Sequence, residues 1–333
     1  MNVRWLLLTV GLAFAINVSA AEKRLDQSFS VQPGGTLTVD ADGANITVRG
    51  ENTDRVHVVV VFEGSSSAIE NAQLSAQPKG RGVEVVAKRS EGWLSWLSAG
   101  SGLRANVTVT VPSRYDLDLK TSGGGITVEA VQGRAIGRTS GGSVNVKSVV
   151  GNVRMHTSGG SISLAEIRGD SQVETSGGRI NASRITGKLD AETSGGGIEL
   201  TDIRGPVDAR TSAGRVVARN VAGDVKLSTS GGGIVAEVEG AIYARTSGGG
   251  IDIALTGANR GIDASTSGGG ISIKVPRDTK ADFDGATSGG SVSCDLPIKL
   301  TRSEGKHLSG AVNGGGPLIK AKTSGGGVRL QGV

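Results

Sequence analysis

The chain has 333 residues, of which 55 are glycine and nine are aromatic, and 36 Lys and Arg against 31 Asp and Glu give a net charge of +5. Glycine follows no Gly-X-Y period and there are only seven prolines, which excludes collagen, while a hydrophobic fraction of 37% and the modest charge exclude a disordered chain. One cysteine excludes an internal disulfide and a zinc site built from cysteines. No basic run is interleaved with aromatics, so we expect no nucleic-acid partner.

Residues 1–20 have the pattern of a secretory signal peptide. Arg4 gives a positive start, residues 5–16 are apolar, and Val18-Ser19-Ala20 is a small-x-small cleavage site. The apolar run is too short to span a membrane, so we expect no transmembrane segment in the mature chain. We therefore expect an exported protein that is periplasmic or secreted to the cell surface.

Residues 21–118 contain strand-like runs separated by glycine turns, without a fixed period. We expect either a less regular β cap for the repeats that follow, or a separate small domain. The run at 56–62 is nearly continuous in apolar residues and predicts a strand buried on both faces. The expected strands lie at 36–39, 45–48, 56–62, 83–87 and 105–111.

A short apolar segment interrupts this region between two of the expected strands. Trp93, Leu94, Trp96 and Leu97 fit one face of a single helical turn. One interpretation is a loop that docks on a partner or a membrane surface, and the other is an apolar plug that folds over the open end of the repeats. We take these four residues as candidate partner contacts.

From residue 119 to 333 one phrase returns at a nearly constant interval. The first six intervals are 18 residues, and the next three are 17, 20 and 21. The last interval of 36 predicts two periods, with a degraded unit around 308–316. Repetition at a short fixed period is typical of a solenoid. The phrase Thr-Ser-Gly-Gly, or a close variant, begins at Thr121, Thr139, Thr157, Thr175, Thr193, Thr211, Thr229, Thr246, Thr266, Thr287 and Thr323.

Each unit alternates apolar and polar residues, which is the period of a strand. Counted from the Thr as position zero, apolar residues fall at positions five, seven, ten, fourteen and sixteen, and a glycine stands at position twelve. We predict an all-β, single-chain parallel β-solenoid, each rung of roughly 18 residues consisting of two strands and two glycine corners. We favour a right-handed coil, because parallel crossovers are overwhelmingly right-handed. The alternative is the left-handed hexapeptide helix, although its apolar residue recurs every six positions.

The residue types that carry out chemistry are scattered. His57, His156 and His307 lie far apart in the sequence, and Cys294 falls at an inward position, where we expect a small buried apolar residue. No serine lies in a Gly-x-Ser-x-Gly motif, and no phosphate loop or calcium-binding nonapeptide repeat is present. Outward Asp and Glu residues alternate with Lys and Arg, and we expect no position at which carboxylates recur on adjacent rungs, as a polysaccharide-cleaving β-helix would need. We expect no catalytic residue, no cofactor and no metal.

The chain resembles a family of bacterial β-strand repeats called "putative adhesin", a domain of unknown function in exported proteins. The resemblance rests on the opening run Phe29-Ser-Val-Gln-Pro-Gly-Gly-Thr-Leu-Thr-Val39, on Val107-Thr-Val-Thr-Val-Pro112, on the repeated Thr-Ser-Gly-Gly units, and on the closing phrases that begin at Asn313 and Thr323. It covers nearly all of the mature chain. It implies a β-solenoid without established catalytic residues.

These observations predict a non-enzymatic, exported β-solenoid of the cell envelope that acts as a binding or adhesion module. Its partner would be an envelope protein or a surface glycan. Two other functions stay open: a polysaccharide-active β-helix enzyme, either lyase or hydrolase, and a structural or regulatory partner in the envelope. The sequence leaves the oligomeric state unassigned.

Overall fold

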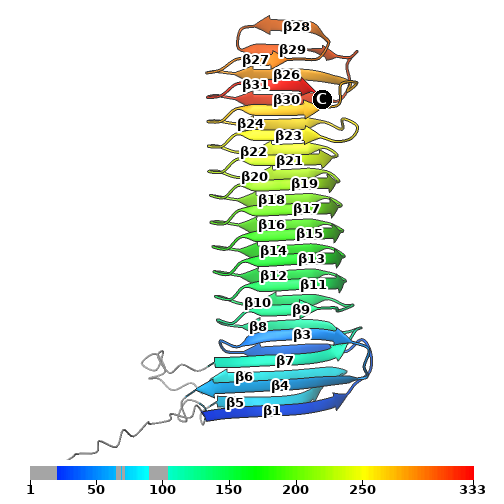
Figure 1. Ribbon diagram of the computed structural model, residues 1–333, viewed down its shortest axis with the longest axis vertical. Helices are drawn as coiled ribbons and strands as arrows, with labels where there is room; N and C mark the ends of the chain where they lie inside the picture. Colours follow the sequence, from blue (N-terminus) through cyan, green and yellow to red (C-terminus); the bar gives the residue numbers. More distant parts are fainter. Residues whose placement is uncertain (1–20, 65–68, 70–71, 90–103) are drawn as a thin grey trace, which may run out of the picture.

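The computed structural model describes residues 21–64, 69, 72–89 and 104–333, in which every named element is a β-strand. The strands stack into a long rod made of two sheets, sheet A with 15 strands and sheet B with 16 (Figure 1). Neighbouring rungs pair in parallel along most of the rod, which confirms the predicted parallel β-solenoid. The pairing does not define the hand of the coil, so right-handedness stays a prediction.

The strands of sheet A, in spatial order, are β1 (Ala21–Ser30), β4 (Arg55–Gly64), β7 (Arg104–Pro112), β3 (Asn45–Glu51), β9 (Ile126–Glu129), β11 (Val144–Val150), β13 (Ile162–Arg168), β15 (Ile180–Thr186), β17 (Ile198–Arg204), β19 (Val216–Ala222), β21 (Ile234–Glu239), β23 (Ile251–Leu255), β25 (Ile271–Val275), β31 (Val328–Gly332) and β27 (Val292–Cys294).

The strands of sheet B, in spatial order, are β28 (Ile298–Glu304), β29 (His307–Val312), β26 (Ala281–Thr287), β30 (Leu318–Thr323), β24 (Ile262–Thr266), β22 (Ile242–Arg245), β20 (Val225–Ser228), β18 (Val207–Thr211), β16 (Leu189–Thr193), β14 (Ser171–Thr175), β12 (Val153–Thr157), β10 (Ala135–Arg138), β8 (Asp116–Thr121), β2 (Thr36–Ala41), β6 (Gly82–Arg89) and β5 (Ala72–Lys79).

The rung formed by β16 and β17 shows how the alternating pattern builds the core. Leu189, Ile198 and Leu200 are at most 1% exposed, whereas Glu192 and Glu199, which alternate with them, face the solvent. Like residues lie in register on neighbouring rungs, so the core consists of aliphatic ladders between the two sheets. Full burial of a large aliphatic side chain contributes about 1.5–3 kcal/mol to the stability of the fold. Each rung adds several such side chains to the core.

The Thr-Ser-Gly-Gly phrase forms one corner of each rung. In the unit that starts at Thr193, the threonine hydroxyl donates to the carbonyl oxygen of Gly178 on the preceding rung at 2.8 Å and accepts from the N–H of Gly196 at 3.3 Å. A Cβ on Gly196 would lie 1.9 Å from that same oxygen of Gly178, so only glycine fits there. The phrase thus combines a buried hydroxyl that caps the corner with a glycine that lets two rungs approach closely.

The narrow interior of the repeats accommodates the large side chains of Met155 and Phe283 because the residue beside each of them is a glycine. Gly137 lies beside Met155 of the following rung, and a Cβ on Gly137 would be 2.5 Å from the methionine sulfur. Phe283, the only phenylalanine in the repeats, has its ring over Gly285 in the same strand, where a Cβ would lie 2.6 Å from ring carbon Cζ. This explains the scarcity of aromatic residues in the repeats.

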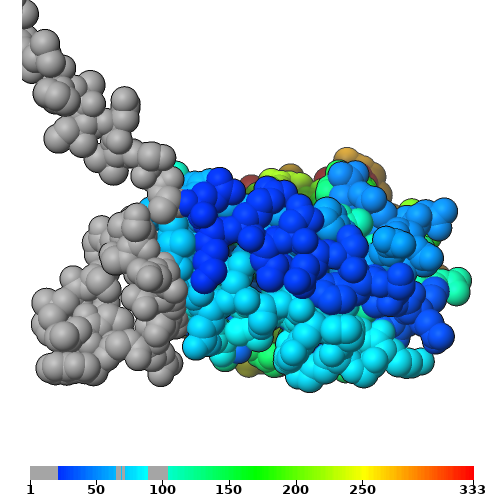
Figure 2. Space-filling view, turned by 90° about the horizontal axis from the view of Figure 1, so that it is seen from below, coloured from blue at the N-terminus to red at the C-terminus, as the bar shows by residue number. Residues whose placement is uncertain are grey.

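The N-terminal strands continue the same two sheets and then cap them. β3 and β7 pair in parallel in sheet A, as do β2 and β6 in sheet B, whereas β1, β4 and β5 pair antiparallel at the end of the rod. Figure 2 looks onto this end, which blue and cyan segments cover. The less regular N-terminal β cap is therefore confirmed. Burial of β4 on both faces is wrong, because Val59 and Val61 are only half-buried on its outer face.

The C-terminal rung does not lie at the tip of the rod. β30 and β31 are inserted between the rung of β24 and β25 and the rung of β26 and β27. The tip is instead an antiparallel arrangement of β26, β29 and β28, at the top of Figure 1. The expectation of a degraded repeat unit around 308–316 is therefore wrong. β29 runs antiparallel in this region, and the chain then returns through 313–317 to place β30 and β31 between the two rungs.

In the part of the chain that the structure describes, no helix has the length and apolar character to cross a membrane.

Candidate functional site

Trp93, Leu94, Trp96 and Leu97 fall within 90–103, outside the described residues. The choice between a docking loop and an apolar plug therefore stays open. The sites that the structure does describe are on the outer faces of the two sheets and at their corners.

Each of the three histidines lies beside a carboxylate at the surface. His57 Nε2 is 2.8 Å from Asp26 Oδ1, and His156 Nδ1 is 3.5 Å from Glu174 Oε2. Hydrogen bonds from Arg24 and His57 hold the pKa of the Asp26 carboxyl below its ordinary value. These two pairs are far apart, and each links two neighbouring strands.

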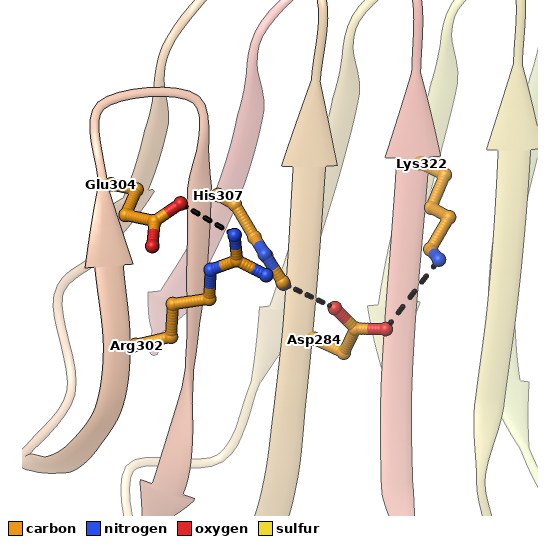
Figure 3. Close-up of polar contacts among 5 residues, drawn as sticks. All are labelled: Asp284, Arg302, Glu304, His307 and Lys322. Carbon is orange, nitrogen blue, oxygen red and sulfur yellow. Dashed lines mark hydrogen bonds and ion pairs between the residues drawn. The ribbon is translucent and has the colours of Figure 1, made fainter.

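The third histidine belongs to a polar cluster near the tip (Figure 3). Asp284 on β26 contacts His307 on β29 at 2.8 Å through Oδ1 and Lys322 on β30 at 3.7 Å through Oδ2. Arg302 and Glu304 form a separate pair within β28. Asp284 thus connects the tip hairpin to the inserted C-terminal rung.

Cys294 lies on β27 in register with Leu330, as its inward position predicted, but it is only half-buried rather than buried as expected. Its thiol lies 3.7 Å from the carbonyl oxygen of Leu296, and burial raises the pKa of the thiol. A raised pKa keeps the sulfur protonated and weakly nucleophilic. Among the described residues, no group of three or more His, Cys, Asp and Glu side chains could hold a metal ion.

An open groove of about 580 Å³ lies on the outer face of sheet B, and we call it the Tyr243 groove. It extends along the rod from Lys188, just before β16, to β30. Tyr243 projects from β22 near its middle, and Pro206, Ala241 and Leu318 add apolar surface. Leu318 is one of the few large apolar residues that stay exposed among the described residues, at 49%. The groove thus offers a ligand an aromatic ring on a largely apolar floor.

The groove lies where the repeat departs from 18 residues. The intervals of 17 and 20 residues begin at Thr229 and Thr246, and the longer one adds a corner loop at 256–261. Asn259 fixes this loop, since its amide donates to the carbonyl oxygens of Pro317 at 2.7 Å and Lys280 at 3.1 Å. The loop and the inserted C-terminal rung together form one wall of the groove.

The expectation that carboxylates do not recur on adjacent rungs is wrong, because Asp208 lies in register with Asp190, and Glu192 with Glu174. Ion pairs, however, engage every carboxylate of the Tyr243 groove. Asp224 pairs with Arg260 at 3.3 Å, Asp263 pairs with Arg245 at 3.8 Å, and Asp208 accepts a hydrogen bond from Arg210.

The cations are only partly engaged. Lys188 is bound to Asp190 at 3.0 Å, and this hydrogen bond raises the pKa of its ammonium group. Lys226 lies 5.9 Å from the centroid of the Tyr243 ring, and the Arg245 guanidinium lies 4.4 Å from it. Within the described residues, Lys226 and Lys320 have no ion-pair partner.

No residue of this groove was a candidate on the basis of the sequence, because the lining residues come from five rungs and from the inserted C-terminal strand. The irregular intervals of 17 and 20 residues were the available signal. They mark the place where the corner changes shape, and the only tyrosine of the repeats lies in the 17-residue interval.

Comparison with known proteins shows similarity in one family. The family model described as "Toastrack DUF4097" matches residues 35–230 and 223–331. No curated protein matches the chain.

Three crystal structures resemble the fold at low identity. A "putative cell adhesion protein" from Clostridium sporogenes is 8% identical, with a TM-score of 0.22 over 95% of this chain and 100% of that chain. A "putative adhesin" from Bacteroides fragilis is 12% identical, with a TM-score of 0.30 over 93% and 97% of the two chains. Another "putative adhesin", from Parabacteroides merdae, is 12% identical, with a TM-score of 0.38 over 95% and 97%. At such low identities and TM-scores, these likenesses identify neither a ligand nor an activity.

The family model, by contrast, spans both the N-terminal cap and the repeats. The chain belongs to the Toastrack DUF4097 family.

Proposed function

We propose that this protein is an exported, non-catalytic binding module of the cell envelope, and that its ligand lies in the Tyr243 groove. The signal-peptide pattern of residues 1–20 supports export. The observation that carries the proposal is the half-buried Tyr243 ring on an apolar floor, flanked by cations, on an otherwise charged face. An aromatic surrounded by convergent polar groups in a hollow is the usual composition of a binding site.

The main alternative is a polysaccharide-active enzyme on the same fold. Glycoside hydrolysis needs a carboxylic acid whose pKa is raised, so that it is protonated when it meets the leaving group. Every carboxyl pKa shift resolved in the described residues is a decrease, caused chiefly by hydrogen bonds from neighbouring side chains, at Asp26, Glu84, Glu166 and Glu304. A lowered pKa keeps these four carboxyls ionised at neutral pH, so none of the four is a candidate general acid.

The proposal is tested with residues 21–333, labelled and titrated onto isolated envelopes of the organism of origin. Tyr243→Ala removes the ring from the groove, and we expect it to weaken binding about tenfold, since aromatic contacts contribute about 0.5–1.5 kcal/mol beyond burial. Ile136→Ala is the matched control, because Ile136 has the same outward position on β10, outside the groove. Equal binding of wild type and Tyr243→Ala would contradict the proposal.

A second measurement separates the enzyme from the binding module. The wild type is incubated with acidic and neutral polysaccharides, and reducing ends and unsaturated products are measured. We expect no turnover. Reproducible turnover that is lost on substitution of Asp208, Asp224 or Asp263 would show that the groove is catalytic.

A further inference from the structure

We infer that the Tyr243 groove accepts a linear acidic glycan, a chain of carboxylate-bearing sugars that lies along the axis of the rod. This inference rests on the proposed function and specifies its ligand. Three features carry it: the unpaired charges of the groove, the spacing of its outward side chains, and the mixture of aromatic and apolar surface beneath them.

The unpaired charges of the groove are positive. The four nearest carboxylates, those of Asp190, Asp208, Asp224 and Asp263, are all engaged by a Lys or Arg. Lys226 and Lys320 are left over, and both line the groove. An ammonium that lacks a carboxylate partner within the described residues attracts an anionic ligand and disfavours a cationic one.

The spacing of these groups follows from the strand register. Lys226, Tyr243, Asp263 and Lys320 are register partners on the four consecutive strands β20, β22, β24 and β30. Parallel strands lie about 4.8 Å apart, so the two lysines are separated by about 14 Å along the rod. A pyranose in an extended glycan advances its chain by about one such step. Sugars two or three apart would therefore bring their carboxylates to Lys226 and Lys320, with the ring of an intervening sugar beside Tyr243.

The remaining surface suits the neutral parts of such a chain. A sugar ring has an apolar face of C–H groups that packs against an aromatic ring and aliphatic carbons, here Tyr243, Ala241 and Leu318. Its hydroxyls can donate to Asp263, whose charge Arg245 already offsets at 3.8 Å. Asp263 and Asp284 lie in register on either side of Lys320, but their carboxylates are engaged by Arg245, and by His307 and Lys322. The ammonium of Lys320 is thus available to a ligand.

The test uses residues 21–333 and two hexasaccharides of the same linkage, one of hexuronate and one of the neutral hexose. Binding is measured by isothermal titration at low and at high salt. We expect the hexuronate to bind more tightly than the neutral chain, and salt to reduce the difference, because screening weakens exposed charge pairs. Lys226→Gln and Lys320→Gln should each weaken hexuronate binding about two- to fivefold.

Lys120→Gln is the charge-matched control, because Lys120 is exposed on the same sheet, on β8 far from the groove. It should leave the affinity unchanged. Thermal melts of all three variants check that the fold is intact, which we expect because each side chain points outward.

The outcomes separate this inference from the proposed function. Equal affinity for both hexasaccharides, reduced by Tyr243→Ala, would overturn the acidic ligand but keep the binding groove. No binding of either glycan, together with envelope binding that still depends on Tyr243, would indicate a protein ligand and would also overturn the inference. Envelope binding that is indifferent to Tyr243 would overturn both.

Discussion

The threonine and the second glycine of each Thr-Ser-Gly-Gly phrase have separate physical roles. The threonine hydroxyl of one rung binds a carbonyl oxygen of the preceding rung, at 2.7–2.9 Å in the regular units. The second glycine lies against that same carbonyl, where a Cβ cannot fit. The first glycine has more room, because a Cβ on Gly195 would lie 3.4 Å from the nearest atom. Two adjacent glycines therefore differ in how much substitution they tolerate.

We predict that Gly196→Ala destabilises the protein by about 1–3 kcal/mol, the usual cost of overpacking. The matched change Gly195→Ala should cost less than about 0.5 kcal/mol, as surface substitutions do. Chemical denaturation of both variants against wild type provides the measurement. Similar losses in the two would show that the close approach to Gly178 is not what requires glycine.

The sequence already shows that the first glycine of the phrase can be replaced. Ala213 replaces the first glycine of its phrase, whereas no unit replaces the second. Glycine corners could be predicted from the repeat alone. The reason that one glycine is replaceable and its neighbour is not depends on the distance between two rungs, which no single unit reveals.

At the scale of the strand, an unusual corner residue bends each of six successive units of sheet A. Position nine has a left-handed backbone, with φ between 51° and 60°, although none of its occupants is glycine. Such a conformation costs about 1–2 kcal/mol for a residue with a Cβ. The side chains at this position stack from rung to rung and form polar contacts that offset part of the cost. The six residues are Ala130, Ser148, Glu166, Arg184, Asp202 and Asn220.

Glu166 is the best-connected of these residues. Its carboxylate accepts hydrogen bonds from Ser148 at 2.7 Å and Arg184 at 3.0 Å, and these bonds lower its pKa from the ordinary value of 4.5. A carboxyl with a lowered pKa in the folded state stabilises the protein above the unfolded pKa. That stability is lost as the pH falls through the folded pKa.

We therefore predict that Glu166→Gln lowers the melting temperature at neutral pH, and that the difference from wild type shrinks between about pH 5 and pH 3. Glu192→Gln is the control, since Glu192 on β16 has no hydrogen-bond or ion-pair partner among the described residues. Its melting temperature should stay close to that of wild type throughout. A Glu166→Gln difference that persists unchanged in acid would refute the charge-based explanation.

The alternation of apolar residues predicted the strands and their inward faces, from Ile126 to Leu330. It did not predict the left-handed corner, because six different residue types occupy position nine and none is glycine. The usual signal for a left-handed backbone was thus absent. Only the fixed distance to the apolar residue at position ten hinted that the strand bends there.

At the scale of the whole molecule, the inserted C-terminal rung determines both the tip and the groove. β30 and β31 bury Ile319, Ala321, Val328 and Leu330 between two other rungs. The same rung contributes Leu318 and Lys320 to the Tyr243 groove. The sequence placed these residues in a final repeat and so at the end of the rod, because it shows the order of units along the chain but not their order in space.

We predict that a chain ending at residue 317 unfolds at a markedly lower temperature. Ile319, Val328 and Leu330 each contribute about 1.5–3 kcal/mol by burial, and four strands, β24, β25, β26 and β27, each lose a partner. A synthetic peptide of residues 318–333 should restore the melting temperature when added in excess, whereas a peptide of the same composition in scrambled order should not. A truncated chain that melts at the same temperature as wild type would show that the rungs on either side are equally stable when the inserted rung is absent.

The inserted rung also sets an order of events during folding. A solenoid can grow by adding each new rung to the one before it, in step with the emergence of the chain. Here that growth stops after β25, because the rung that lies on β24 and β25 follows β26 to β29 in the sequence. Until residues 318–332 have emerged, β24 and β25 each expose an open edge, which makes this stage the one most open to pairing with another chain.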